Sequence, residues 1–175
     1  GLASGGNKTR KLEYLLADAK QKGADTLVTI GGLQSNHARQ TAAAAAKFGF
    51  NCELILQEVA GSPTNNYSDN GNILLDHLFG ASIHQLSINQ DCDEYAQKLI
   101  NEIKLNGRTP YLIPVGGSDE IGSLGYVRCA SEIFPQLNDE KSHIEQIALA
   151  NSSAGNQAGL LAGLQAEKGE THALC

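Results

Sequence analysis

Short apolar segments alternate with longer helical segments along almost the whole chain. The apolar segments are about five residues long and rich in β-branched or aliphatic side chains, the usual length of strands. This alternation predicts βαβ units, a mostly parallel sheet and helices on both of its faces. Strands are expected at 26–30, 52–57, 82–86, 110–114 and 144–150, and at the C-terminal end. Helices are expected between 8 and 23, 36 and 49, 69 and 80, 93 and 105, 121 and 134, and 156 and 165.

The composition describes a folding globular chain and argues against several classes of function. Of the 175 residues, 41% are hydrophobic and 18% are charged. The net charge of −6 opposes binding to nucleic acid or to an anionic membrane, and no apolar run approaches the length of a membrane span. The cysteines lie far apart without CxxC spacing, which favours reduced thiols over disulfides or a zinc site. We therefore expect a cytoplasmic protein without a bound metal.

The opening segment carries the residues that most suggest chemistry. Two glycines precede Asn7, and after Lys8 the residues Leu12, Leu15 and Leu16 recur with the spacing of one apolar helix face. Asn7 is suited to cap this helix, which would place Lys8 in the first turn. There the helix dipole opposes protonation of the amine, and burial would lower its pKa further. Such an amine can form a Schiff base, although the position alone is also compatible with a solvated lysine.

The segment Gly5–Tyr14 resembles the cofactor-lysine motif of a family of pyridoxal-phosphate (PLP) enzymes. This is the 1-aminocyclopropane-1-carboxylate (ACC) deaminase and D-cysteine desulfhydrase family, whose fold is similar to the tryptophan synthase β subunit. In the family, the lysine after Gly-Gly-Asn binds PLP covalently, and this role maps to Lys8. The resemblance also implies that Asn7 lies at the cofactor and that Lys11 approaches its phosphate. It covers essentially the whole chain.

A polar loop at 31–37 follows the first expected strand and leads into a helix. In open parallel sheets, ligands bind where strands end and helices begin. Polar side chains and amides at Gln34, Ser35 and Asn36 suit an anion such as a carboxylate, and a plain helix cap at Ser35 or Asn36 is the alternative.

The segment 34–43 also resembles the matching loop of the same family. The resemblance implies that Asn36 contacts the hydroxyl group of the cofactor ring and that Ser35 is a nucleophile or a proton-transfer group. It also implies that the amides of 34–36 bind the substrate carboxylate. His37 is typical of the desulfhydrase branch, whereas ACC deaminases tend to have glutamine. We expect His37 to make a structural hydrogen bond and not to act as a catalytic base.

A second loop, 151–156, consists of small residues in front of a helical segment. Several amides and a helix N-terminus can form a phosphate cradle there, and a plain turn is the alternative. The resemblance identifies this loop as the PLP phosphate loop, usually Gly-Ser-Gly/Ala-Gly-Thr. The implied cofactor contacts are Ser152, Ser153, Ala154, Gly155 and Asn156. Ser152 stands where the family has a glycine that can take positive φ, and Asn156 replaces a hydroxyl donor.

A third segment, from Ile113 to Ser118 with Gly122, Gly125 and Tyr126, also resembles the desulfhydrase version of the family. We interpret its glycines first as turn and close-approach residues.

The expected fold class is α/β, with parallel sheets flanked by helices in a tryptophan synthase β-like PLP enzyme fold, present here as a partial chain. Residues 1–24 would be a lead-in helix on the large-domain side, and 25–138 the small α/β domain. Residues 139–175 would start the large-domain segment, after a polar connection at 135–141. Because the chain lacks methionine and begins inside a motif, we expect it to be an internal part of a longer protein.

The sequence thus predicts a PLP-dependent lyase that converts D-cysteine to pyruvate, sulfide and ammonia by α,β-elimination. ACC and sulfonated cysteine analogues such as cysteate are alternative substrates within the family. We expect a homodimer at full length that acts on a small amino acid, and an inactive chain when these residues stand alone. A non-catalytic α/β domain that packs against a partner is the alternative of a different class.

Overall fold

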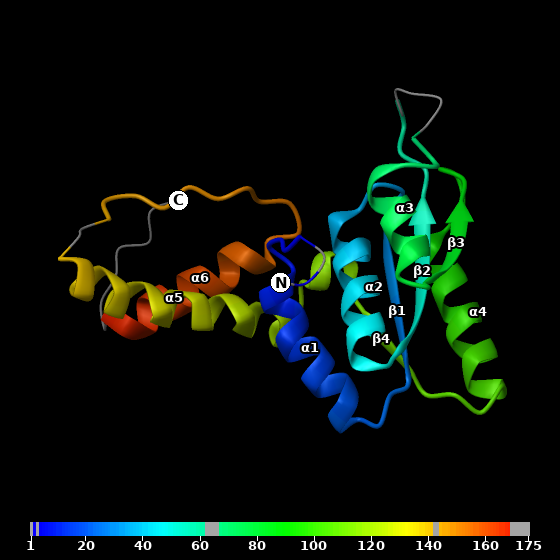
Figure 1. The fold of residues 1–175 in the computed structure, drawn as a ribbon, viewed down its shortest axis with the longest axis horizontal. Coiled ribbons are helices and arrows are strands. Elements are labelled where there is room, and N and C mark those ends of the chain that lie inside the picture. Colours follow the sequence, from blue (N-terminus) through cyan, green and yellow to red (C-terminus); the bar gives the residue numbers. More distant parts are fainter. Residues whose placement is uncertain (1, 3, 62–66, 142–143, 169–175) are drawn as a thin grey trace.

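A four-stranded parallel sheet forms the centre of the computed structural model, which describes residues 2, 4–61, 67–141 and 144–168 (Figure 1). The strand order is β3-β2-β1-β4. The strands are β1 (Thr26–Gly32), β2 (Asn51–Gln57), β3 (Ser82–Leu86) and β4 (Pro110–Ile113). The central strand β1 is in register with Asn51 of β2 and Pro110 of β4 at Thr26. The parallel pairing confirms the expected α/β architecture.

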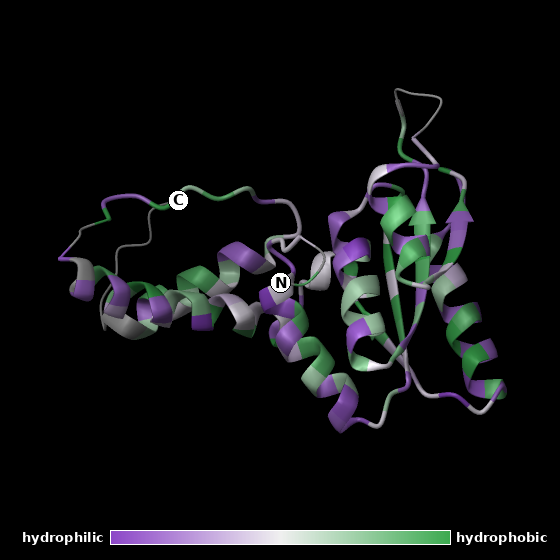
Figure 2. Cartoon of the chain, viewed as in Figure 1, coloured by the Kyte–Doolittle hydropathy of each residue, from purple (hydrophilic) through white to green (hydrophobic). Residues whose placement is uncertain are grey.

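Helices connect the strands and extend the chain beyond them. They are α1 (Thr9–Gln21), α2 (Asn36–Phe48), α3 (Gly71–Leu78), α4 (Cys92–Leu105), α5 (Glu120–Glu140) and α6 (Gly155–Lys168), with a 3₁₀ turn η1 (Val115–Gly117) after β4. Helix α2 ends where predicted, at Gly49, whose φ of 77° closes the helix in a left-handed conformation. Helices α1, α4 and α5 carry hydrophilic and hydrophobic residues side by side, as expected for helices with one buried face (Figure 2). Among the described helices, none is long and apolar enough to cross a membrane.

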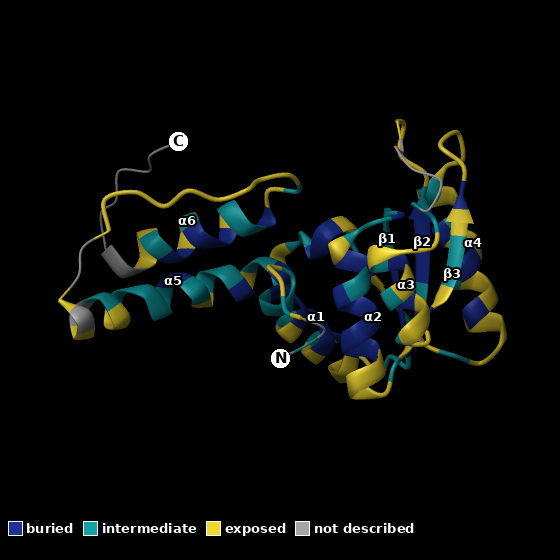
Figure 3. Cartoon of the chain, turned by 45° about the horizontal axis from the view of Figure 1, so that its top comes forward, coloured by how far each residue is buried: buried dark blue, intermediate teal, exposed yellow. Residues whose placement is uncertain are grey.

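The sheet has a hydrophobic cluster on each face. Along β1, Leu27 belongs to one cluster and Val28 to the other, and in β2 the same alternation separates Leu54 from Ile55. Helices α1, α2 and α3 cover the first face, whereas α4 covers the second. Figure 3 shows the buried residues concentrated on β1 and β2 and on the helix faces that meet them. The expectation of helices on both faces is therefore confirmed.

Helices α5 and α6 pack against each other and extend away from the sheet, with α1 between this pair and the sheet (Figure 1). Glycines allow the close contacts. A Cβ added to Gly125 of α5 would meet the backbone of Arg10 in α1, and one added to Gly163 of α6 would lie 2.6 Å from the Cβ of Ala130 in α5. Because the helices approach so closely, the start of α6 is brought to the start of α1.

Two expected elements are wrong. The polar segment 135–141 is not a loop, because α5 continues through Pro135 to Glu140. A proline removes one helical hydrogen bond but does not stop its neighbours from taking helical angles. The segment 144–150 is not a strand but an exposed, non-repetitive stretch, and no strand lies beside it among the described residues to supply hydrogen bonds. The expected C-terminal strand falls outside the described residues, and the division into domains stays a prediction.

Candidate active site

The predicted cofactor lysine and the predicted phosphate loop meet at one point. The Lys8 amine lies 3.3 Å from where a Cβ of Gly116 would be, and the Ser153 hydroxyl lies 2.6 Å from the same position. Gly116 belongs to the turn after β4, and its φ of 67° is in the left-handed region that favours glycine. Since all four strands are parallel, the loops after β1 and β4 open at the same edge of the sheet. The turn after β4 therefore lies at this edge, with the Lys8 amine and Ser153 beside it.

Beside Lys8, a second lysine of the N-terminal segment, Lys11 in α1, is fully buried, and its amine reaches the start of α6. Lys11 Nζ donates to Ser118 Oγ at 2.7 Å and to the Gly116 carbonyl at 3.1 Å. Ser118 Oγ in turn lies 2.6 Å from Ser153 Oγ. A Cβ on Gly155 would lie 2.7 Å from both Lys11 Nζ and Ser118 Oγ, so only glycine lets these side chains approach the start of α6 so closely. One cation, two hydroxyl groups and a helix N-terminus thus meet at one place, and such groups suit an anion.

Burial tunes the charges of these residues. It lowers the pKa of Lys8, as expected from its position. The pKa of Lys11 falls to about 8, first because of burial and then because of the nearby Lys8 charge, while Asp119 acts in the opposite direction. Burial and the two lysine charges lower the pKa of His37 to about 3, so this ring is neutral. The site therefore combines an amine that deprotonates more easily than free lysine with a neighbour that keeps a positive charge below pH 8.

The start of α1 differs from the prediction that Asn7 caps the helix. Lys8 occupies the cap position, and no side-chain cap bond is formed there by the residue itself. Its N–H instead donates to Gln40 Oε1 at 3.0 Å, from the neighbouring helix α2. The Asn7 side-chain oxygen accepts from Asn36 Nδ2 at 2.9 Å, and the Asn7 carbonyl accepts from the Tyr126 hydroxyl at 3.0 Å. Asn7 and Asn36 thus lie together beside Lys8.

In the loop after β1, the predicted substrate residues have structural partners of their own. Ser35 caps α2, since its hydroxyl oxygen accepts from Ala38 N–H at 3.2 Å. The Gln34 side chain donates to the Tyr67 carbonyl at 2.7 Å and accepts from Asn72 N–H at 2.8 Å. It is therefore turned toward the segment that leads into α3. A substrate contact from Gln34 would have to come from its backbone amide, and the roles of 34–36 stay predictions.

His37 makes the structural hydrogen bond that its position predicts. Its Nε2 lies 3.0 Å from Thr29 Oγ1, and the same hydroxyl donates to the Ile113 carbonyl at 2.8 Å. His37 is 3% exposed and connects α2 to β1 and β4 underneath the site.

In the predicted phosphate loop, the residue with positive φ is not the serine that replaces the family's glycine. Among the described non-glycine residues, positive φ occurs in this loop at Ala154, with φ of 60°, and not at Ser152. The Gly155 N–H donates to the Ser153 carbonyl at 2.8 Å, so this amide already has a partner within the loop. Asn156 Oδ1 is buried without a hydrogen-bond partner among the described residues. The asparagine also carries an NH₂ group, so the loss of the family's hydroxyl does not leave the position without a donor.

Two residues of the site were not predicted. Ser118 follows a Gly-Gly pair directly after β4, so the strand-end rule could have found it. Gln40 lies inside an alanine-rich helical run, where a glutamine carries no sequence signal of its own.

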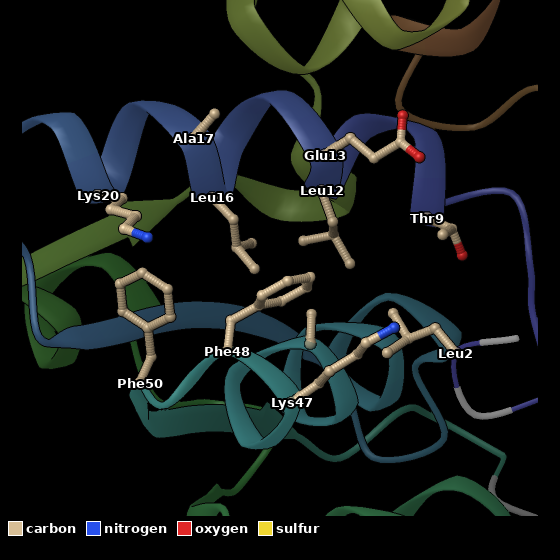
Figure 4. A pocket seen from close by; sticks show the side chains of 11 residues that line it. Leu2, Thr9, Leu12, Glu13, Leu16, Ala17, Lys20, Lys47, Phe48 and Phe50 are labelled. Carbon is tan, nitrogen blue, oxygen red and sulfur yellow. The ribbon is translucent and has the colours of Figure 1, made fainter.

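A separate groove shows that hollow shape alone does not locate the site. It has a volume of about 450 Å³ and lies between α1 and the end of α2 (Figure 4). Phe48 points toward Leu12 and Leu16 in it, with Lys20 and Lys47 at the rim (Figure 4). None of the predicted site residues lines it.

The residues at the strand ends fit a phosphorylated cofactor that reacts with an amine. The groups that meet at Gly155 can bind an anion, and the Lys8 amine and the Ser153 hydroxyl meet beside Gly116. A parallel α/β fold with these two features defines a cofactor-dependent enzyme of the PLP type. The chain belongs to the family of pyridoxal-phosphate-dependent enzymes, whose family model matches residues 2–175.

Within this family, the chain is similar to proteins of one branch. The chain is 48% identical over 164 residues to D-cysteine desulfhydrase of Salmonella paratyphi A, covering 94% of this chain and 50% of that protein. It is 46% identical to D-cysteine desulfhydrase of Serratia proteamaculans over the same shares of the two chains. The crystal structure of an ACC deaminase homologue superimposes with a TM-score of 0.80 at 41% identity, covering 94% of this chain and 48% of that one. The chain thus spans about half the length of these relatives.

Proposed function

We propose that this chain supplies the lysine-bearing half of a PLP-dependent lyase that cleaves D-cysteine into pyruvate, sulfide and ammonia. The observation that carries the proposal is the meeting of the Lys8 amine with the Ser153 loop around the Gly116 position. Relatives at 48% and 46% identity that are named D-cysteine desulfhydrase support the choice of substrate.

In this proposal each residue has a defined task. Lys8 Nζ would hold the cofactor covalently and would accept the proton from the substrate Cα. Its lowered pKa favours the neutral amine that both tasks require. When bound, PLP supplies an electron sink for the electrons left on that carbon.

The other residues hold the two ligands. Lys11, Ser118 and the loop 152–156 bind the phosphate, and Asn36 orients the ring. Ser35 would exchange a proton with the substrate, and the amides of 34–36 would hold its carboxylate.

The second candidate reaction is deamination of ACC. The ACC deaminase homologue at 41% identity supports this alternative within the same family, and a cysteate-type lyase is a further one. His37, which favours the desulfhydrase branch in sequence, is buried against Thr29. If His37 distinguishes the desulfhydrase branch from the ACC deaminases, it does so without contacting the substrate.

We further propose a cytoplasmic homodimer for the complete protein. The acidic net charge of −6 and the free thiols of Cys52, Cys92 and Cys129 support a reducing compartment. Light scattering on the purified product of the complete gene tests the dimer.

The central experiment uses the product of the complete gene. We expect a visible absorbance band with PLP, and borohydride reduction should fix the cofactor to Lys8 as shown by peptide mass. Lys8→Ala should abolish sulfide release from D-cysteine while the far-ultraviolet circular dichroism stays unchanged, because the Lys8 side chain makes no cap hydrogen bond to α1 and its N–H to Gln40 is kept. Labelling of Lys11 or Lys20 instead, or full activity of Lys8→Ala, would contradict the assignment. Ammonia release from ACC without sulfide release from D-cysteine would select the second candidate, and absence of any PLP band would favour a non-catalytic domain.

A further inference from the structure

Gln40 is a fully buried glutamine whose side chain faces the segment that carries the predicted cofactor lysine. It lies in the second turn of α2, four residues after Asn36, and is 0% exposed. A buried side-chain amide has both a donor and an acceptor group that need hydrogen-bond partners. Its partners therefore show which segments it holds together.

The acceptor end of Gln40 holds the start of α1. Oε1 accepts from the Lys8 N–H at 3.0 Å and from the Thr9 hydroxyl at 3.3 Å. The first N–H groups of a helix have no partner within the helix, and Lys8 makes no side-chain cap bond of its own. Gln40 therefore caps α1 from the neighbouring helix.

The donor end of Gln40 bonds to the first residue of its own helix, Asn36. Nε2 donates to the Asn36 carbonyl at 2.8 Å, and the Asn36 side chain donates to Asn7 Oδ1 at 2.9 Å. Asn7 precedes Lys8 in the chain, so the four residues form a closed ring of hydrogen bonds and one peptide link. Gln40 is the member of this ring that bonds to both Lys8 and Asn36.

The backbone of the lysine-bearing segment packs directly against the Gln40 side chain. A Cβ on Gly6 would lie 2.5 Å from Gln40 Nε2, so the backbone before Lys8 rests directly on the glutamine. The α2 helix also holds this segment through Arg39, whose Nη2 donates to the Gly5 carbonyl at 3.2 Å. The approach of the lysine-bearing segment to α2 is thus defined at Gly5, Gly6 and Lys8.

We propose that Gln40 is a positioning residue for the covalent attachment of the cofactor, an inference that rests on the proposed function. Its amide fixes the Lys8 backbone relative to Asn36 and so determines where the Lys8 amine meets the cofactor aldehyde. In that step Lys8 Nζ bonds to the aldehyde carbon and the aldehyde oxygen leaves as water. A positional error of about 1 Å between reacting groups can slow a reaction roughly a hundredfold. Gln40 acts through the backbone and does not touch the reacting atoms.

The test separates binding from attachment in the product of the complete gene. Gln40→Met keeps the length of the side chain and removes all three hydrogen bonds. Binding is measured with pyridoxine 5′-phosphate, which has an alcohol in place of the aldehyde and cannot attach. Attachment is measured as the rate at which borohydride-stable PLP appears on Lys8, followed by peptide mass. Gln57→Met is the matched control, because Gln57 also makes three side-chain hydrogen bonds, to carbonyls of the segment 87–90 that follows β3.

We expect Gln40→Met to bind pyridoxine 5′-phosphate within about threefold of wild type and to attach PLP roughly ten to a hundred times more slowly. Part of its label should move to Lys11. Gln57→Met should match wild type in both measurements. If Gln40→Met fails to fold, the attachment rate is measured in Gln40→Glu instead. This variant keeps the acceptor for the Lys8 N–H but loses the donor to Asn36. Above the pKa of the new carboxyl it should attach PLP more slowly than wild type.

Three results would overturn the proposal. Attachment to Lys8 at the wild-type rate in Gln40→Met, or in Gln40→Glu where that variant decides, would remove the positioning role and leave the proposed function intact. A parallel loss of thermal stability and pyridoxine 5′-phosphate binding, with unchanged attachment of the bound cofactor, would reduce Gln40 to a structural residue. Wild-type protein that carries no label on Lys8 would refute the proposed function and the positioning role together.

Discussion

Lys11 Nζ donates a 2.7 Å hydrogen bond to Ser118 Oγ, and the Ser153 hydroxyl lies 2.6 Å beyond it. This relay joins the first helix, the turn after β4 and the loop before α6. It places the Lys11 amine, whose charge depends on pH, beside the position that we assign to a phosphate group.

The pH dependence of anion binding follows from Lys11. Its pKa of about 8 means that it is protonated below that pH and neutral above it. We therefore expect the affinity for inorganic phosphate to fall as the pH rises from 7 to 9, when measured by isothermal titration calorimetry. Lys11→Met should lower the affinity at pH 7 by roughly ten to a hundredfold, as expected for loss of a charged hydrogen bond of about 1.5–3 kcal/mol. It should also remove most of the pH dependence. Lys20→Met, on the other side of α1, is the control, and an affinity that stays level between pH 7 and 9 would refute the role of Lys11.

A single methyl group at Gly155 would displace the side chains of Lys11 and Ser118. In Gly155→Ala the new Cβ would start 2.7 Å from Lys11 Nζ and Ser118 Oγ, so the lysine end must move away. We expect phosphate or PLP affinity to drop at least about tenfold with little change in the melting temperature. Gly163→Ala, on the same helix, should behave differently, because its Cβ would lie 2.7 Å from the Val127 carbonyl and force α5 and α6 apart. A larger loss of stability in Gly155→Ala than in Gly163→Ala would contradict this reading.

Asp76 in α3 is expected to destabilise the fold at neutral and alkaline pH. Its side chain is 0% exposed, and neither carboxylate oxygen has a hydrogen-bond partner among the described residues. Burial raises its pKa to about 7, with the Arg39 charge acting in the opposite direction, and the buried Cys52 thiol also faces it. Because the folded state holds the proton more tightly than the unfolded state, stability is lost as the pH rises from about 4 to 7 and stays lower above that range.

Asp76→Asn should remove this penalty. Urea unfolding at pH 8 should show a gain of roughly 2 kcal/mol over wild type, since one pKa unit corresponds to about 1.4 kcal/mol and solvent relaxation reduces the full value. At pH 4 both proteins carry a neutral side chain and should be nearly equal. An equal difference at pH 4 and pH 8 would show that ionisation of Asp76 is not its cause.

The segment 144–150 should give the chain an apolar surface when residues 1–175 stand alone. Ile144, Ile147 and Leu149 are 43%, 42% and 39% exposed. We expect this chain to bind a dye specific for apolar surface, and serine at all three positions to reduce the signal by roughly half. Serine at the equally exposed Leu74, in α3, is the control. An unchanged signal in the triple variant would place the dye elsewhere.

The sequence predicted most of the fold because strand and helix periods are local properties. It failed at 144–150, where an apolar run becomes a strand only if another strand pairs with it. It also failed at Asn7, because the contact with Asn36 competes with capping and is visible only in three dimensions. The same limit explains why Lys8 and Asn36 could be named from motifs, whereas the role of Gln40 could not.

The central position of β1 has a consequence for how the protein is made. The Thr29 hydroxyl in β1 donates a hydrogen bond to the Ile113 carbonyl, 84 positions later. The Tyr126 hydroxyl donates one to the Asn7 carbonyl, 119 positions away. Contacts between such distant parts of a chain must overcome a large loop-closure entropy and form slowly. Lys8 therefore leaves the ribosome long before the groups that complete its surroundings. Under the proposed function, a nascent chain would present the Lys8 amine before the predicted phosphate loop is in place, and attachment of the cofactor would follow closure of the sheet.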